Sequence, residues 1–117
     1  MKTKAIAIVY QFDMVILSMN GVNLAAPTDA ENTYIYKSGL DIKRTLKELY
    51  ESGSIDYVYM NSCLFHTITL FKNEFLINEV GGKTAARAVY EWATLKKRAF
   101  IEDKCDMPMC SQNCSAP

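Results

Sequence analysis

The chain has 117 residues, half of them hydrophobic, and its thirteen basic side chains balance thirteen acidic ones. This length fits one domain and is too short for two. Because the formal net charge is zero, no overall field attracts a nucleic acid or a membrane, and the same balance argues against an acidic mimic of DNA.

An apolar run, Ala5 to Tyr10, follows the short basic N-terminus. Gln11 and Asp13 interrupt it before it reaches the length of about seven residues that a secretory signal needs. No stretch approaches the roughly 18 apolar residues of a membrane helix. The sequence therefore predicts a strand here, no membrane segment and a cytoplasmic location, where the four cysteines are free thiols.

The N-terminal half predicts strands, turns and one helix. Asn20-Gly21 favours a hairpin, and the polar residues 25–32 indicate a surface loop. A helix is predicted over 39–51, because Ser38 can cap its start and Gly53 can end it. The strands are predicted at 4–10, 14–19 and 33–37.

The C-terminal half predicts three more strands, a second helix over 83–100 and an irregular C-terminal tail over 101–117. The strands are at 55–60, 65–71 and 74–80, the last two forming a hairpin around Lys72-Asn73. Together these elements predict one α+β domain over 1–100. Its fold is a mostly antiparallel sheet of about five strands with two helices packed on one face.

Gly81-Gly82-Lys83-Thr84 stands between a predicted strand and a predicted helix, as the end of a P-loop does. The full motif has an earlier glycine at the position of Ile77, so nucleotide hydrolysis is not supported. Lys83 and Thr84 remain candidate anion-binding residues. The favoured alternative is a glycine hinge that leads into a helix.

Three cysteines near the C-terminus, Cys105, Cys110 and Cys114, are candidate zinc ligands that Cys63 and His66 could complete. No Cys-x-x-Cys pair supports a metal site. Free thiols are therefore favoured over a disulfide within the tail, and both over a metal, so no cofactor is predicted.

Cys63 and His66 also have the chemistry of a nucleophile and its base. No orienting carboxylate or amide and no oxyanion hole can be assigned to them from the sequence. We therefore predict no catalytic residues and a protein that is not an enzyme.

Four of the seven tyrosines form two pairs, Tyr34 with Tyr36 and Tyr57 with Tyr59. Residues two apart in a strand face the same side, so each pair would form an aromatic stripe suited to a protein partner. The alternative is that the rings pack beneath the helices. Lys43, Arg44 and Lys47 lie on the first predicted helix and would flank such a surface.

These observations predict a small non-enzymatic protein that docks on a larger protein or complex as a regulator or inhibitor. Accessory proteins that phages direct against host machinery are of this kind. The alternative is a nucleic-acid-binding accessory protein that uses the tyrosine face with flanking lysines. An enzyme ranks third, and the balanced charge is compatible with a homodimer.

Overall fold

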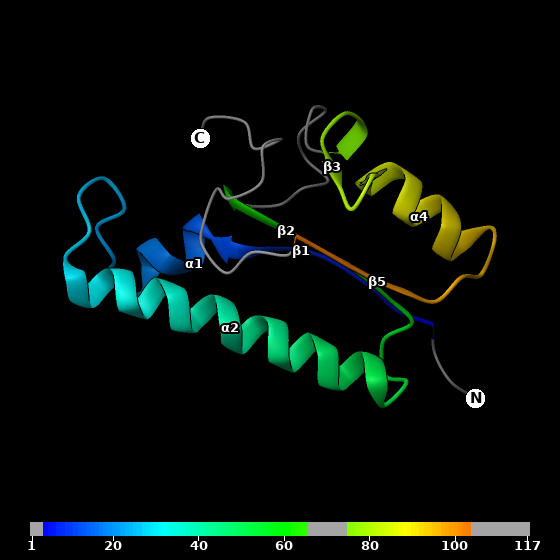
Figure 1. The fold of residues 1–117 in the computed structure, drawn as a ribbon, viewed down its shortest axis with the longest axis horizontal. Coiled ribbons are helices and arrows are strands. Elements are labelled where there is room, and N and C mark those ends of the chain that lie inside the picture. Colours follow the sequence, from blue (N-terminus) through cyan, green and yellow to red (C-terminus); the bar gives the residue numbers. More distant parts are fainter. Residues whose placement is uncertain (1–3, 66–74, 104–117) are drawn as a thin grey trace.

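The computed structural model describes residues 4–65 and 75–103, which form an α/β arrangement of three layers (Figure 1). A parallel sheet with the strand order β1-β2-β5 lies in the middle. Helix α2 covers one face, and helix α4 covers the other. The elements in chain order are β1 (Ile6–Asp13), α1 (Met14–Met19), α2 (Asp29–Glu51), β2 (Tyr57–Phe65), β3 (Glu79–Val80), β4 (Lys83–Thr84), α4 (Ala85–Ala93) and β5 (Ala99–Glu102).

The predicted antiparallel sheet with helices on one face is wrong. Both pairings of β2 are parallel, and β3–β4 is the antiparallel pair in the described part of the chain. Parallel strands are covered on both faces and therefore carry apolar residues at successive positions. In β2, Tyr57 and Tyr59 are buried on one face, and Val58 and Met60 on the other. Strand β2 is therefore covered on both faces.

Residues 14–19 form helix α1, not the predicted strand. Asp13 is its N-cap, and the carboxylate oxygen Oδ1 accepts hydrogen bonds from the backbone nitrogens of Val15 at 2.9 Å and Ile16 at 3.1 Å. This cap outweighs the β propensity of the segment.

The predicted strand at 33–37 lies inside helix α2, which begins at Asp29. The cause is a capping box: Glu31 N donates to Thr28 Oγ1, and Thr28 N donates to Glu31 Oε1, both at 3.1 Å. The predicted end of the helix at residue 51 is confirmed, and Gly53 follows with a φ of +82°.

The second predicted helix is shorter than expected. α4 ends at Ala93, Lys96 adopts a φ of +53°, and the chain enters β5 at Ala99. Ile101 and Glu102 therefore lie in a strand, not in an irregular tail. The predicted strand at 65–71 falls almost wholly outside the described residues. Of the predicted strand at 74–80, residues 75–80 are described, and among them Glu79–Val80 is the part that forms a strand.

Two apolar clusters hold the layers together, one on each face of the sheet. On the α4 face, Tyr10, Tyr57 and Tyr59 pack with alanines of α4. On the other face, Phe12 packs with Leu17, Val22 and Ile35 of α1, α2 and the loop between them. In the described residues, no helix is long and apolar enough to cross a membrane.

Candidate functional site

The tyrosines predicted to bind a partner are divided between core and surface. Tyr57 and Tyr59 are fully buried, so the predicted exposed stripe is wrong for this pair. The cause is α4, which covers that face of β2. Tyr34 and Tyr36 are 43% and 41% exposed, and they lie on helix α2. They remain available to a partner, although not as a strand stripe.

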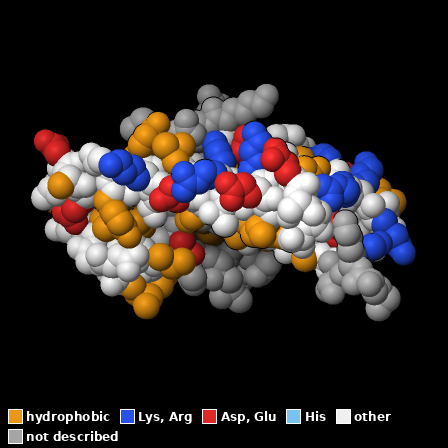
Figure 2. Space-filling view, turned by 90° about the horizontal axis from the view of Figure 1, so that it is seen from below, with side chains coloured by type: hydrophobic (Ala, Val, Ile, Leu, Met, Phe, Trp, Pro, Cys, Tyr) orange, Lys and Arg blue, Asp and Glu red, His pale blue; other side chains and the backbone are white. Residues whose placement is uncertain are grey.

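The basic residues of α2 take part in local ion pairs. Lys43 Nζ lies 3.7 Å from Glu102 Oε2, and Arg44 Nη2 lies 2.9 Å from Asp41 Oδ1. Lys47 is exposed. Figure 2 shows basic and acidic side chains interspersed over this face, rather than a continuous basic stripe. Binding of a protein or a nucleic acid here stays a prediction.

Lys83 and Thr84 are also bound within the chain. Lys83 Nζ lies 2.6 Å from Glu91 Oε1, and Thr84 Oγ1 caps α4 by accepting a hydrogen bond from Arg87 N. Anion binding by this pair would compete with these contacts and stays a prediction.

Cys63 is disulfide-bonded, which corrects the prediction of free thiols at this position. A cysteine in a disulfide is not a nucleophile, so the Cys63–His66 pairing loses its reactive group. Cys105, Cys110, Cys114 and His66 lie outside the described residues.

Glu91 on α4 is the most highly connected carboxylate in the described part of the chain. It is buried and contacts the cations of Lys83 at 2.6 Å, Arg87 at 3.3 Å and Lys97 at 3.7 Å. The hydrogen bond from Lys83 is the largest of the effects that lower the pKa of Glu91 to about 2. Burial, together with the hydrogen bond to Glu91, raises the pKa of Tyr57. Both carboxylate oxygens of Glu91 accept hydrogen bonds from these donors. We therefore assign this cluster a role in stability and not in catalysis.

Buried polar residues also gather toward the carboxyl ends of the parallel strands. Ligands of open α/β sheets bind outside this edge. Gln11, at the irregularity in β1, donates from Nε2 to the carbonyl oxygen of Gly39 at 3.2 Å. In β2, Asn61 Oδ1 accepts from the backbone nitrogen of Cys63 at 2.6 Å.

Ser62 and Asp103 form the chemically most useful pair at this edge. β5 pairs with β2 as far as Glu102 opposite Met60, so Asp103 follows directly and reaches Ser62. Asp103 Oδ2 accepts from Ser62 Oγ at 2.8 Å and from Ser62 N at 2.9 Å. The hydroxyl proton thus points at a carboxylate that can accept it. Ser62 is fully buried, so a substrate would reach it only after the residues that cover it move.

Sequence reasoning missed this pair, because the two residues are 41 positions apart and neither belongs to a recognisable motif. The signal present in the sequence is that two polar residues, Asn61 and Ser62, interrupt an otherwise apolar strand. A small pocket of about 20 Å³ lies at the end of β1, between that strand and helices α1 and α2, and has room for about one water molecule.

A parallel sheet between helices, with a serine and a carboxylate at the carboxyl ends of its strands, defines an α/β domain. No known protein family and no curated protein matches the sequence. Two crystal forms of the Wnt deacylase Notum from Drosophila are similar in structure, with TM-scores of 0.70 and 0.75 at 20% and 22% identity. They align with 93% and 99% of this chain, which spans only 30% and 31% of theirs.

This likeness establishes the fold and no more, since the identity is low and most of Notum has no counterpart here. It nevertheless contradicts the prediction that the chain is not an enzyme. That prediction rested on the absence of a recognisable catalytic set, whereas the fold is similar to part of a protein named as a deacylase.

Proposed function

We propose that the chain is the sheet core of an acyl-ester hydrolase, with Ser62 as the nucleophile and Asp103 as its proton acceptor. The observation that carries the proposal is the 2.8 Å hydrogen bond from Ser62 Oγ to Asp103 Oδ2 at the carboxyl edge of the sheet. The fold shared with a deacylase supports it.

In the proposed reaction, Ser62 Oγ attacks the acyl carbonyl carbon while its proton passes to Asp103. The bond from the acyl carbon to the alcohol oxygen breaks, and the departing alkoxide takes the proton. Water then cleaves the acyl-serine, which releases the carboxylic acid and restores the hydroxyl.

The test is ester hydrolysis by the purified chain with p-nitrophenyl acetate and p-nitrophenyl octanoate. We expect hydrolysis that falls at least about 100-fold in Ser62→Ala and Asp103→Asn, because both remove groups used in the chemical step. Ser18→Ala is the matched control, since Ser18 is an exposed serine on α1.

A fluorophosphonate probe with peptide mass spectrometry locates the nucleophile independently. Labelling is expected at Ser62 and absent from Ser62→Ala. A folded chain that neither hydrolyses the esters nor is labelled at Ser62 contradicts the proposal.

The proposed compartment rests on the disulfide at Cys63 and is independent of the hydrolase proposal. The disulfide at Cys63 favours an oxidising environment over the cytoplasm that the sequence predicted.

Docking on a larger protein also stays a prediction and is compatible with catalysis. Hydrophobic side chains exposed around α1 and the start of α2 offer the surface for it, among them Ile16, Met19 and Tyr34.

A further inference from the structure

A pocket of about 230 Å³ lies at the opposite edge of the sheet from Ser62, so it is independent of the proposed hydrolase function. The segments that precede parallel strands meet at one edge. Lys4 stands shortly before β1, Asp56 directly before β2 and Arg98 directly before β5. Trp92, Lys96 and Lys97, from the end of α4 and the turn after it, complete the lining.

The pocket is strongly cationic within a chain of zero formal net charge. Its lining has four positive side chains and one carboxylate, a formal charge of +3. Asp56 is already engaged: its Oδ1 lies 3.8 Å from Arg98 Nη1, and its Oδ2 accepts from the backbone nitrogen of Ala5 at 3.3 Å.

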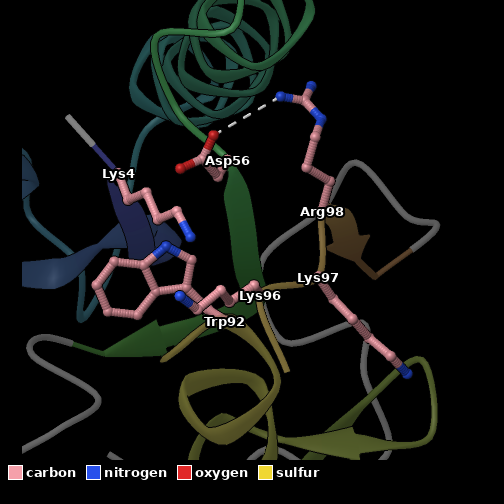
Figure 3. A pocket seen from close by; sticks show the side chains of 6 residues that line it. All are labelled: Lys4, Asp56, Trp92, Lys96, Lys97 and Arg98. Atoms are coloured by element: carbon pink, nitrogen blue, oxygen red, sulfur yellow. Dashed lines mark ion pairs between the residues drawn. The ribbon is translucent and has the colours of Figure 1, made fainter. Parts of the chain in front are cut away.

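Two of the four cations are available to a ligand. Arg98 binds the carbonyl oxygen of Tyr50 at 2.9 Å, and Lys97 lies 3.7 Å from Glu91. Lys4 and Lys96 are exposed, and neither forms an ion pair with the part of the chain that the structure describes. Figure 3 shows both reaching toward the Trp92 indole, whereas Lys97 and Arg98 point away from it.

Trp92 supplies a second and independent sign of a ligand. Its Nε1 is buried and has no hydrogen-bond partner in the described part of the chain. An unsatisfied buried donor is costly, on the order of 1–3 kcal/mol, and calls for a partner. Figure 3 shows this nitrogen on the side of the ring that faces Lys4.

The helix dipole accounts for only part of this arrangement. Cations after α4 are favoured by the negative end of its dipole. Lys4 comes from another element, however, and the dipole gives the indole nitrogen no acceptor.

We propose that this pocket binds a small phosphate monoester. At neutral pH such a group carries about −1.5 to −2 charges and three acceptor oxygens. The ammonium groups of Lys4 and Lys96, which form no ion pair with the described residues, match the charge, and the indole N–H adds a third donor. The indole face offers a surface on which a planar substituent of the ester can stack.

The fluorescence of Trp92 reports on this pocket directly, because the chain has a single tryptophan. We would titrate the full chain with phenyl phosphate, inorganic phosphate and benzoate, with sodium chloride keeping the ionic strength constant. We expect a saturable change with phenyl phosphate, at least about tenfold weaker binding of benzoate because it carries one charge, and inorganic phosphate in between.

Lys4→Gln and Lys96→Asn together should weaken phenyl phosphate binding at least about tenfold. Asparagine is chosen because it tolerates the positive φ of Lys96. Lys37→Gln, on the exposed surface of α2, is the matched control and should bind like the wild type. Circular dichroism checks that each variant folds, and Lys4→Gln alone leaves the turn after α4 unchanged.

Any one of the following outcomes overturns the proposal. The first is a fluorescence change that chloride reproduces, the second is benzoate binding as tightly as phenyl phosphate, and the third is unchanged binding by the folded lysine variants. If free phosphate binds more tightly than phenyl phosphate, the site recognises the inorganic anion and not an ester.

Discussion

The hydroxyl of Tyr57, the first residue of β2, donates a 2.8 Å hydrogen bond to Oε1 of Glu91 on α4. Both residues are buried, and they are 34 positions apart in the chain. This hydrogen bond links α4 to the central strand β2 within a core that is otherwise apolar. It also explains why Glu91, alone among the acidic residues of the described chain, is buried.

Glu91→Ala should destabilise the protein by about 2–4 kcal/mol, since it leaves the Tyr57 hydroxyl and Lys83 without their acceptor. Tyr57→Phe should cost only about 1 kcal/mol, because Lys83 still satisfies the carboxylate. Urea unfolding of both variants measures the two costs. Equal costs would show that the cations contribute nothing.

The same carboxylate should make stability depend on pH. Its pKa is lowered from 4.5 to about 2 in the folded protein. A lowered folded-state pKa stabilises above the unfolded value, so the contribution is fully present above pH 4.5 and is lost as the pH falls toward 2. The difference in unfolding free energy between wild type and Glu91→Gln should therefore shrink as the pH is lowered from 5 to 2. A constant difference over this range would contradict the assignment.

The fold could be predicted from the sequence only where local signals were strong. Gly53 correctly predicts the end of α2, and the predicted strand at 55–60 overlaps β2 over residues 57–60. The strand direction was missed, because the connection from β1 to β2 is helical only if Asp13 and Thr28 are recognised as caps. The prediction of strands at 14–19 and 33–37 replaces the helical connection between the parallel strands β1 and β2 with a series of hairpins.

The candidate site was harder to predict for a different reason. Ser62 and Asp103 meet only because β2 and β5 are neighbours in a parallel sheet. A wrong sheet topology therefore hides the pair completely. The prediction of an exposed stripe of Tyr57 and Tyr59 is wrong for a similar reason. The two tyrosines do share one face of a strand, but α4 covers that face.

Gly39→Ala tests the packing of α2 on the sheet. Alanine in a helix interior normally adds about 0.5–1 kcal/mol of stability relative to glycine. Here a Cβ at position 39 would collide with the buried Phe12 ring, lying 2.8 Å from Cζ. We therefore expect a net loss of about 1–3 kcal/mol by chemical denaturation. Thr45→Ala, exposed on the same helix, should change stability by less than about 0.5 kcal/mol. A Gly39→Ala protein that is more stable than wild type would place α2 farther from β1.

Ser62→Ala and Asp103→Ala separate a structural role from a catalytic one. Ser62→Ala removes one hydrogen bond and leaves the backbone nitrogen of residue 62 bound to Asp103, so it should cost about 1 kcal/mol. Asp103→Ala leaves both donors of Ser62 unsatisfied and should cost about 2–3 kcal/mol. In the Ser62→Ala background the same aspartate substitution should cost less, because only one donor then depends on it. Equal costs in both backgrounds would mean that the hydroxyl does not use this carboxylate. If Ser62→Ala abolishes ester hydrolysis while its stability falls by only this small amount, the lost activity belongs to the hydroxyl and not to unfolding.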